Sequence, residues 1–451
     1  MAFSFHGGVH PRGNKHMTAS GSICNVVVPQ EVYVPIVQHI GAPATIAVAV
    51  GDQVKKGQML ATAESFVCSP VFSPISGTVK AIEKRKAVSG KNIDHVVIAK
   101  GEGEEFLLPK LENPTAEQIR ARIREAGIVG MGGAGFPTDV KLTLPQGVSV
   151  DTLLINGAEC EPYLTCDYRI LLERTEDFIC GVKYLAKAVG ASKVVIAVED
   201  NKAEAISLLA KREEVVLVNG KGKKNRATAA QKEGDLIQLI AVRTKYPQGA
   251  EKQLIYATLG RVVPDGGLPS AAGVVVNNVH TALATCYAVR EGKPLYERIV
   301  TVSGKAVGKP GNYLLPTGMT YRDVAALCDV NEEEVAEIIS GGPMMGKAVY
   351  SLDVAVTKTT SGILFLTADE VSRANPDPCI GCGRCVKSCP MGLMPLFIDK
   401  AALEKDEATA EKYGALSCIA CGCCSYVCPA KRPLVQSIQM IKTKLAGRKK
   451  Q

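Results

Sequence analysis

The sequence predicts a multidomain α/β protein, and three observations support that class. The chain has 451 residues, enough for two to four domains. Between residues 150 and 290, short apolar runs alternate with helical segments, the order typical of α/β sheets. Near the C-terminus, two cysteine runs of identical spacing indicate a separate helical domain built around metal. We expect domains at residues 1–110, 111–297, 298–350 and 351–451.

Residues 40–100 are expected to form a small β domain. The segments "VGDQVKKGQML" and "SPISGTV" resemble the two halves of the biotinyl/lipoyl-type barrel-sandwich fold. In that fold, a lysine at the hairpin tip between the halves carries the cofactor. No lysine occurs between Lys56 and Lys80. The resemblance therefore implies the fold with a structural role.

A helix is expected over residues 115–126, leading into a glycine-rich loop. Thr115 and Gln118 have capping-box spacing, and Gly127 suits the helix end. The loop allows backbone N–H groups to approach a phosphate or a flat ring. Its glycines match G-x-G-x-x-G at Gly130, Gly132 and Gly135, with Gly133 between them.

This glycine pattern does not predict a standard dinucleotide-binding fold. In that fold the loop follows a strand, whereas here a helix precedes it. Pro137 suits the first turn of a following helix, whose N-terminus would favour an anion. Lys141, in or just past that turn, would add a positive charge.

The α/β region places polar residues at the ends of predicted strands. The strand "VDTLLING" runs into Glu159 and Glu161, and the strand "GVVVNNVHT" ends in Asn277 and Asn278. Open α/β sheets bind ligands outside the carboxyl ends of their strands. A solvated turn is the alternative for the two glutamates. Helices over residues 168–189, the strand "KVVIAVED" and a helix from Ala203 complete the alternation.

Residues 299–345 change to short strands and turns, followed by a helical segment. This stretch resembles the small soluble-ligand-binding β-grasp module. It contains no cluster of titratable residues that indicates chemistry. We therefore expect a scaffold role.

The two cysteine runs share the spacing C-x2-C-x2-C-x3-C-P, with which bacterial ferredoxin-type domains hold two iron–sulfur clusters. Zinc is an alternative, but it does not need a third cysteine at this spacing or the trailing Cys-Pro. A disulfide framework suits small secreted chains instead. The fourth cysteine of each run usually ligates the other cluster. One 4Fe–4S cluster is expected on Cys379, Cys382, Cys385 and Cys428 (the first cysteine set), and the other on Cys418, Cys421, Cys424 and Cys389 (the second cysteine set), leaving Cys423 spare.

Composition limits the function classes. No apolar run reaches the roughly 18–20 residues needed to cross a bilayer. The N-terminus lacks signal-peptide features, so sixteen cysteines indicate a reducing compartment. His6, His10 and His16 could bind metal, but no pattern sets their geometry.

The formal charge of +8 is concentrated at the C-terminus. A solvated tail is one interpretation. Attraction to an anionic membrane or to an acidic electron-transfer partner is another. Nucleic acid is disfavoured because no aromatic residues lie among the charges. The basic residues after Cys428 are Lys431, Arg432, Lys442, Lys444, Arg448, Lys449 and Lys450.

Several motifs resemble one family in combination. The stretches "GGAGFPTDVK", "INGAECEP", "YPQGAEKQL" and "VNNVHT" occur in the same order as in the flavoprotein subunit of respiratory NADH dehydrogenases, where they build the FMN and NADH pockets. The N-terminal "GGVHPRGNK", the barrel-sandwich segment and the two cysteine runs restrict the resemblance to one family among the proteins that share these motifs. Over nearly its whole length, the chain is similar to the RnfC family, the NADH-oxidising iron–sulfur flavoprotein subunits of Rnf ion-translocating complexes.

The resemblance implies roles for individual residues. Met131, Ala158 and Ala250 stand where the dehydrogenase pattern has Arg, Asp and Glu, which removes charge near the nucleotides. No side chain is expected to act as nucleophile or general base. FMN contacts are implied for Gly130, Gly133, Lys141, Asn156, Glu159, Tyr246, Gly249, Asn277 and Asn278, and positions facing NADH are implied for Phe136, Glu161 and Glu251.

As a function, the resemblance implies the NADH-binding subunit of a membrane-bound ferredoxin:NAD oxidoreductase. Electrons would pass between NAD(H) and the 4Fe–4S clusters through FMN, because NADH gives up a hydride while a cluster takes one electron. Partner subunits, among them an iron–sulfur subunit and integral membrane subunits, would translocate Na+ or H+. The chain would be peripheral, on the cytoplasmic face of the bacterial cell membrane.

Three alternatives are weighed against that function. The cobalamin reductase of bacterial microcompartments resembles the core but begins near the glycine loop. An electron-transfer adaptor would carry clusters without a nucleotide site. A stand-alone soluble dehydrogenase would need no membrane partner.

Overall fold

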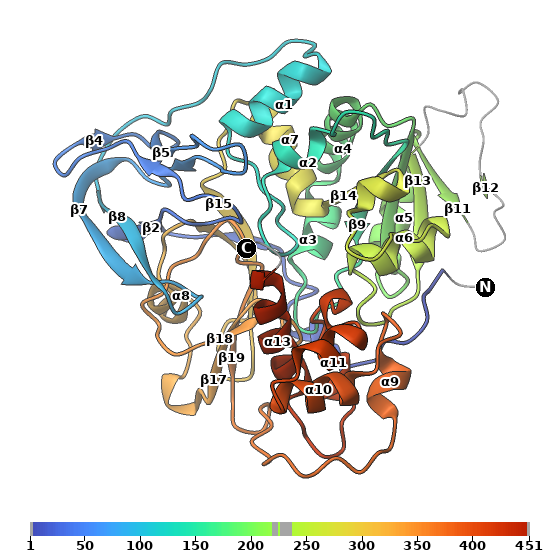
Figure 1. The fold of residues 1–451 in the computed structure, drawn as a ribbon. Helices are drawn as coiled ribbons and strands as arrows, with labels where there is room; N and C mark the ends of the chain where they lie inside the picture. The colour runs from blue at the N-terminus through green and yellow to red at the C-terminus, as the bar shows by residue number, and fades with distance from the viewer. Residues whose placement is uncertain (1–2, 219–223, 226–236, 449–451) are drawn as a thin grey trace.

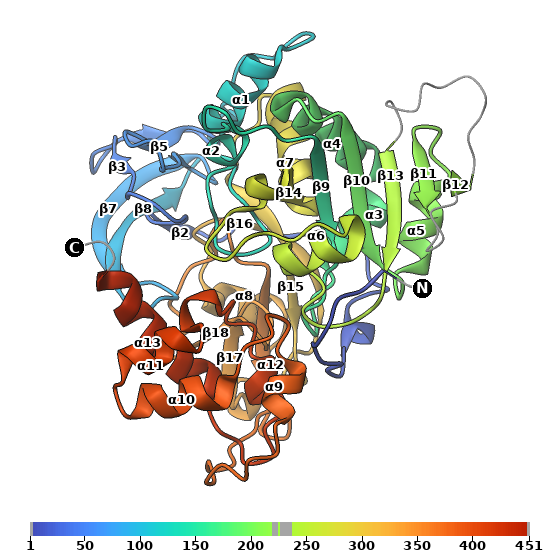
Figure 2. The same ribbon diagram turned by 45° about the vertical axis from the view of Figure 1, so that its right-hand side comes forward.

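The structure is a computed structural model that describes residues 3–218, 224–225 and 237–448. Figures 1 and 2 show a blue β-rich region, a green sheet with helices on both faces, an orange sheet, and a red helical region at the C-terminus. The multidomain α/β class predicted from the sequence is confirmed. Among the helices of these residues, none combines the length and the apolar character that a bilayer crossing requires.

The N-terminal β region consists of two small sheets around one apolar core. The strand orders are β2-β8-β7-β4 and β3-β5-β6. Val32, Leu60 and Ile98 are completely buried in the core between them. This arrangement confirms the expected barrel-sandwich domain. Its strands are β2 (Glu31–Pro35), β3 (Thr45–Ile46), β4 (Gln53–Val54), β5 (Met59–Thr62), β6 (Val71–Phe72), β7 (Gly77–Lys86) and β8 (Asn92–Lys100).

The central sheet, here called the nucleotide sheet, has the strand order β12-β11-β13-β10-β9-β14. Its strands run parallel except for β12. The predicted strands and helices of this region are confirmed. β11, β12, β13, α6, η2 and α7 were not among the predicted elements. The whole region contains α1 (Ala116–Glu125), α2 (Thr138–Leu142), β9 (Thr152–Gly157), α3 (Cys166–Glu173), α4 (Thr175–Val189), β10 (Lys193–Glu199), α5 (Ala203–Ala210), β11 (Val215–Val218), β12 (Lys224–Asn225), β13 (Ile237–Val242), α6 (Glu251–Leu259), η2 (Pro269–Ala272), β14 (Val274–Asn278) and α7 (Val279–Arg290).

Both faces of the nucleotide sheet are buried, which explains its continuous apolar strands. Along β9, Leu153 and Ile155 join the apolar cluster that contains the α4 and α7 side chains. Leu154 points to the opposite face and joins the cluster of α6. On the first face, α1 begins with the predicted capping box, in which Thr115 and Gln118 exchange hydrogen bonds.

A second six-stranded sheet, here called the scaffold sheet, has the order β1-β16-β15-β19-β17-β18. β19 lies between β15 and β17, so the boundary expected at residue 350 falls inside this sheet. The N-terminal strand β1 adds to its other edge beside β16. The elements are β1 (Ile23–Asn25), β15 (Glu297–Ser303), β16 (Gly311–Pro316), α8 (Tyr321–Leu327), η3 (Glu332–Glu334), β17 (Glu337–Ser340), β18 (Lys347–Val349) and β19 (Gly362–Leu366).

The C-terminal cluster domain is helical, and its long helices pack through small and aliphatic residues. Ile398 and Ala401 of α10 meet Ile438 and Ile441 of α13 in one apolar cluster. The two short helices α9 and α12 each follow a glycine with positive φ at the same position of the two cysteine runs. The helices are α9 (Arg384–Ser388), α10 (Pro395–Leu403), α11 (Glu407–Lys412), η4 (Ala415–Ser417), α12 (Cys423–Tyr426) and α13 (Leu434–Arg448).

Much of the basic C-terminus is used inside the cluster domain. Lys444 and Arg448 pair with the Glu407 carboxylate at 2.5 Å each. Lys442 donates to the Cys418 carbonyl, also at 2.5 Å. These cations therefore act first as structural partners of the domain. Lys449 and Lys450, counted in the predicted basic tail, lie outside the described residues.

Candidate nucleotide site and cluster domain

The carboxyl ends of β9 and β14 bring predicted site residues side by side. Asn278 is in register with Asn156 on the neighbouring strand. The Asn156 amide donates to the Gly249 carbonyl at 2.7 Å. The Asn278 side chain accepts from the His280 N–H at 2.8 Å, which caps α7, and donates to Asp167 at 2.6 Å. Both asparagines are therefore held in fixed orientations at the edge of the sheet.

The glycine loop lies beside these asparagines. The Gly130 N–H donates to the Phe136 carbonyl at 2.8 Å, which closes the loop. A Cβ at Gly132 would lie 3.1 Å from the Asn278 side chain, so the loop passes close to β14. At Gly133, no atom lies within 4 Å of such a Cβ. The loop is thus packed at one point and open at the next.

Gly135 fixes the far end of the loop. Its φ of +71° is in the left-handed region, and a Cβ there would come 2.5 Å from the Thr359 methyl group. The next turn is α2, the helix predicted after the loop; Pro137, expected in its first turn, is its N-cap residue. Lys141 of α2 pairs with Glu251 at 2.5 Å, and both side chains are partly exposed. Phe136 is 36% exposed at the same edge, so a ligand can reach it.

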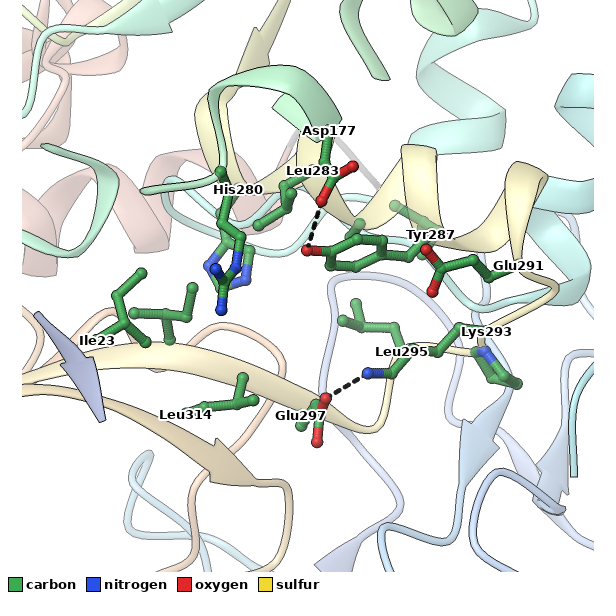
Figure 3. Close-up of a pocket in the computed structure, with 15 residues that line it drawn as sticks. Ile23, Asp177, His280, Leu283, Tyr287, Glu291, Lys293, Leu295, Glu297 and Leu314 are labelled. Atoms are coloured by element: carbon green, nitrogen blue, oxygen red, sulfur yellow. Dashed lines mark hydrogen bonds and ion pairs between the residues drawn. The ribbon is translucent and has the colours of Figure 1, made fainter. Parts of the chain in front are cut away.

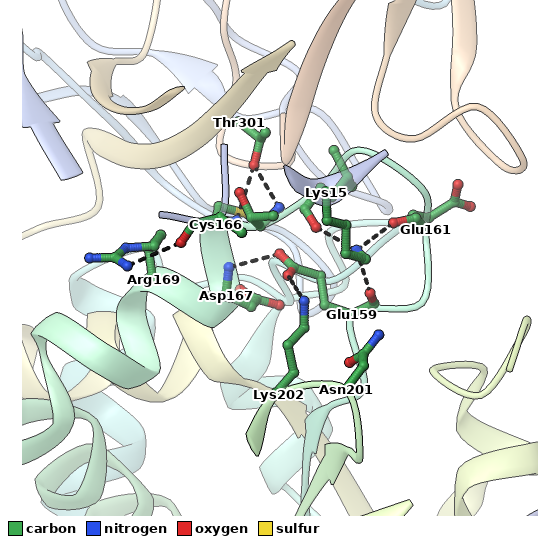
Figure 4. A network of polar contacts seen from close by, with 12 residues as sticks. Lys15, Glu159, Glu161, Cys166, Asp167, Arg169, Asn201, Lys202 and Thr301 are labelled. Carbon is green, nitrogen blue, oxygen red and sulfur yellow. Dashed lines mark hydrogen bonds and ion pairs between the residues drawn. The ribbon is translucent and has the colours of Figure 1, made fainter. Parts of the chain in front are cut away.

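A buried polar network surrounds the acids that follow β9 (Figure 4). One carboxylate oxygen of Glu159 accepts from the Asp167 N–H at 2.9 Å. The other lies 3.8 Å from the Lys202 ammonium. From the N-terminal segment, Lys15 donates to the carbonyls of Glu159 and Glu161 at 2.8 Å each and to that of Leu164 at 2.5 Å. Lys15 therefore fixes the backbone that carries both predicted acids.

Burial changes the protonation of several carboxyl groups here. Burial raises the pKa of Glu161 to about 7, although the Met344 N–H donates to it at 3.0 Å. Burial likewise raises the pKa of Glu199, at the end of β10, to about 7. The pKa of Asp167 also rises to about 7, through burial and then through the Glu159 charge. Near neutral pH, these groups can donate as well as accept hydrogen bonds.

Unpartnered buried atoms mark the same strand ends. Gln248 is completely buried, yet neither atom of its amide has a partner among the described residues. The Asn277 amide nitrogen and both Glu199 oxygens are likewise unpaired there. Buried polar groups are nearly always hydrogen-bonded, to protein, water or ligand. Amide donors and acceptors beside an open glycine loop fit a flavin ring and its phosphate.

A separate cavity of about 380 Å³ lies between α4, α7 and the scaffold sheet (Figure 3). Its polar side chains largely pair with one another. Tyr287 donates to Asp177 at 3.1 Å, and Lys293 pairs with Glu297 at 2.5 Å. None of the predicted nucleotide residues lines this cavity. The predicted nucleotide residues therefore lie at the strand ends and not around this cavity.

The first cysteine set gathers around one cavity of the cluster domain. Cys379, Cys382, Cys385 and Cys428 all line it, although Cys428 belongs to the second run. This is the crossed arrangement expected from the spacing. Cys379 and Cys382 are exposed, whereas Cys385 is buried. The first set therefore opens to the surface.

The second cysteine set is more deeply placed. Burial raises the pKa of Cys424 to about 12, and the neighbouring thiols of Cys421, Cys418 and Cys389 add to the rise. The N–H of Leu393 donates to the Cys389 sulfur at 3.4 Å, the kind of contact that tunes cluster potentials.

No group of three or more His, Cys, Asp or Glu side chains in residues 3–218, 224–225 and 237–448 could hold a single metal ion.

Tyr246 joins the nucleotide sheet to the second cysteine set. It is 1% exposed, and its hydroxyl donates to the Cys421 carbonyl at 2.8 Å. The same hydroxyl lies 3.4 Å from the Glu161 carboxylate. Cys423, predicted to be spare, is completely buried with its sulfur 3.9 Å from the Tyr246 carbonyl. The second set therefore lies against the predicted nucleotide residues.

Sequence reasoning missed several members of this site. Glu199 lies at the end of the predicted strand "KVVIAVED" and Lys202 follows it, so the strand-end rule that indicated Glu159 could have indicated them too. Lys15 lies in a segment without periodicity, and no sequence signal placed it under the acids. His16, grouped with His6 and His10 as a candidate metal ligand, follows Lys15 in the short helix η1 (Lys15–Met17).

Comparison with known proteins fits this geometry. The family model "RnfC Barrel sandwich hybrid domain" matches residues 3–103, the model "Nuo51 FMN-binding domain" matches residues 123–286, and the model "4Fe-4S dicluster domain" matches residues 372–429. One component of the proton-translocating ferredoxin:NAD+ oxidoreductase complex of Clostridium ljungdahlii is 41% identical, over 98% of this chain and 94% of that protein. The chain belongs to the RnfC family.

Other RnfC relatives cover the chain equally well. The corresponding component of the Na+-translocating ferredoxin:NAD+ oxidoreductase complex of Acetobacterium woodii is 40% identical, over 99% of this chain and 98% of that protein. A component of an ion-translocating oxidoreductase complex of Rhodobacter capsulatus is 41% identical, over 99% of this chain and 84% of that protein. The match to a solved structure of an NAD+-reducing NiFe hydrogenase covers 73% of this chain and 63% of the hydrogenase chain, with 20% identity and a TM-score of 0.49.

Proposed function

We propose that this RnfC protein is the NAD(H)-binding subunit of a ferredoxin:NAD oxidoreductase that is coupled to ion translocation. Electrons pass between NAD(H) and the two 4Fe–4S clusters by way of FMN. The observation that carries this proposal is the position of Tyr246. Its loop belongs to the nucleotide site, and its hydroxyl binds the backbone of a cluster ligand, Cys421.

The chain supplies groups suited to hold FMN. Bound FMN would exchange a hydride with NAD(H) and single electrons with the clusters. The open backbone at Gly133 and the buried amides of Gln248 and Asn277 offer contacts for the phosphate and the ring. Asn156 and Asn278 hold the strand ends in register beside them. We assign the remaining predicted contacts, Gly130, Gly132, Gly135, Lys141, Glu159, Tyr246 and Gly249, to the same site.

NADH would approach from the partly exposed side of the site. Phe136 and the Lys141–Glu251 pair lie on that side. Glu161 is more enclosed and faces Tyr246 and the Met344 N–H. We therefore assign Phe136 and Glu251 to positioning the nicotinamide nucleotide. Glu161, with its pKa near 7, would hold a proton between this site and the second cysteine set.

The two clusters would act in sequence. The second cysteine set packs against Tyr246, and the first set opens to the surface. The first set is thus the exchange point with another redox protein. The relatives' names support a complex of several subunits. We propose that an iron–sulfur subunit and integral membrane subunits are the partners, with this chain peripheral on the cytoplasmic face and Na+ or H+ as the ion.

Anaerobic purification followed by an optical spectrum, with and without NADH, tests the proposal. We expect broad iron–sulfur absorbance and flavin peaks that both bleach on NADH addition. Substitution of Gln248 by Leu, which keeps the side-chain volume and removes the buried amide, should lower flavin content while the cluster absorbance stays. Clusters that do not respond to NADH after FMN is added back would refute the proposal and favour an electron-transfer adaptor.

A further inference from the structure

The first cysteine set differs from the second in its access to the surface. Cys379 and Cys382 are exposed, and Ile380 between them is 71% exposed. Cys421 and Cys424 of the second set are only 7% and 8% exposed. The loop of residues 379–382 is therefore the edge of the cluster domain at which another macromolecule comes nearest to a cluster.

The charges around this loop are mainly positive and unpaired. Arg384 lines the cavity of the first set, Lys387 is one turn further along α9, and Lys431 follows Cys428 by three residues. All three are exposed, and in the described part of the chain none forms an ion pair with a carboxylate. The adjacent Arg432 is neutralised by Asp399 at 2.6 Å.

One acidic residue lies on the same edge. The Asp377 N–H donates to the Ala430 carbonyl at 2.9 Å, which places this exposed residue beside the cavity. Among the described residues, three unpaired cations and the Asp377 carboxylate therefore lie on this edge. The C-terminal helix does not share this excess, because Lys442, Lys444 and Arg448 have partners within the domain.

We propose that the edge formed by residues 379–387 and Lys431 is a docking surface for an electron-transfer protein that carries carboxylates around its own redox centre. The inference rests on the proposed function, since it concerns the exit from the first cluster. Complementary charge steers such encounters and raises association rates by 10- to 1,000-fold at low salt. A single exposed aliphatic side chain inside a charged rim suits a small, transient interface.

A charge-reversal pair tests this surface without changing the cluster cavity. In the holoprotein, Lys387→Glu with Lys431→Glu reverses two rim charges. A matched control, Lys55→Glu with Lys91→Glu, makes the same change in net charge on exposed lysines of the barrel-sandwich domain. The probe is an acidic bacterial ferredoxin with two 4Fe–4S clusters. Its Kd is measured at 50 and 300 mM salt, together with the rate at which the reduced ferredoxin reduces NAD+ through the protein.

At 50 mM salt, we expect the rim variant to weaken binding and to slow ferredoxin oxidation by NAD+, each by roughly tenfold, while the control stays within about twofold. At 300 mM salt the difference should shrink, because screening weakens the same attraction. Bleaching of flavin and clusters by NADH should be equal in all three proteins. That last measurement tests the proposed function separately, since ferredoxin binding can be measured whether or not NADH reduces the protein.

Two results would overturn the docking surface. One is an equal effect of the rim and control variants on ferredoxin binding. The other is unchanged ferredoxin binding together with a loss, in the rim variant alone, of binding to phosphatidylglycerol vesicles. The second result would assign the cations to a lipid surface instead.

Discussion

Lys358 offers a quantitative test of how the barrel-sandwich domain is attached to the nucleotide domain. The side chain is completely buried. Its ammonium donates to the Ser69 hydroxyl at 3.2 Å, to the Pro70 carbonyl at 2.6 Å and to the Gly127 carbonyl at 2.8 Å. Pro70 belongs to the barrel sandwich, and Gly127 precedes the glycine loop. One buried cation therefore connects the two domains next to the predicted flavin site.

Two opposing terms determine the effect of Lys358→Met. The variant loses three hydrogen bonds, at about 1 kcal/mol each. It also removes a buried charge, whose cost is visible in the pKa: burial lowers the pKa of Lys358 from 10.5 to about 7. That difference corresponds to roughly 5 kcal/mol in total. Because the two terms are of similar size, stability at a single pH does not separate them, whereas its change with pH does.

Proton linkage gives the direction in which the free energy of unfolding changes with pH. Between pH 7 and 10.5 the unfolded chain binds the proton and the folded protein does not, so stability rises with pH in this window. From pH 6.5 to 9, the wild type should gain roughly 2.5 kcal/mol relative to Lys358→Met. The exposed Lys91→Met variant is the matched control, and its difference from the wild type should stay constant with pH.

Urea unfolding at the two pH values, followed by circular dichroism because the chain has no tryptophan, measures this difference. The transition to follow is the one that the Lys358 substitution moves, since a chain of several domains need not unfold in one step. A difference that is constant with pH, or that falls as pH rises, would refute the reasoning. It would mean that the three oxygen acceptors stabilise the ammonium at least as much as burial destabilises it.

Three further substitutions test the site and the clusters. Lys15→Met removes the donor to three carbonyls, so the Kd for FMN, measured by flavin fluorescence on flavin-free protein, should rise roughly tenfold or more, and an unchanged Kd would count against this role. Cys428→Ala should lower the iron content by about half while Cys423→Ala leaves it unchanged, and equal losses would contradict the ligand assignment. Tyr246→Phe leaves the Cys421 carbonyl without its donor, so cluster reduction by NADH in stopped flow should slow with the bound FMN retained; an unchanged rate would argue against coupling through this contact.

Local patterns predicted the elements that depend on local physics. The capping box of Thr115 and Gln118 and the alternation of strands with helices in the nucleotide sheet follow from short-range patterns, and both are confirmed. The strand-end rule led to Glu159 and Asn278 because parallel strands place their carboxyl ends along one edge, whereas Asn156 was implied only by the family resemblance. The regular cysteine spacing likewise predicted the gathering of the first cysteine set around one cavity.

The sequence could not predict residues whose role depends on contacts between distant segments. Lys358 stands in the polar run "TKTTS", which predicts an exposed segment, yet its ammonium is enclosed by carbonyls of Pro70 in the barrel sandwich and of Gly127 just after α1. β19 completes the scaffold sheet from beyond the expected module boundary, because its pairing with β15 depends on chain topology. The unpaired cations at the first cysteine set stand out only after the structure has paired those of the C-terminal helix.

The N-terminal segment, which has no predicted secondary structure, contacts both the cluster domain and the predicted nucleotide residues. Gly7 passes so close to a cluster ligand that a Cβ there would lie 2.6 Å from the Cys389 carbonyl oxygen. Two residues later, Val9 pairs with Tyr246, and Lys15 then binds the carbonyls beneath the predicted acids. Nine residues of one chain thus contact the second cysteine set and the nucleotide site. Because a continuous backbone joins both contacts, the segment restrains the distance between the second cysteine set and the predicted flavin contacts, on which electron transfer between the two cofactors would depend.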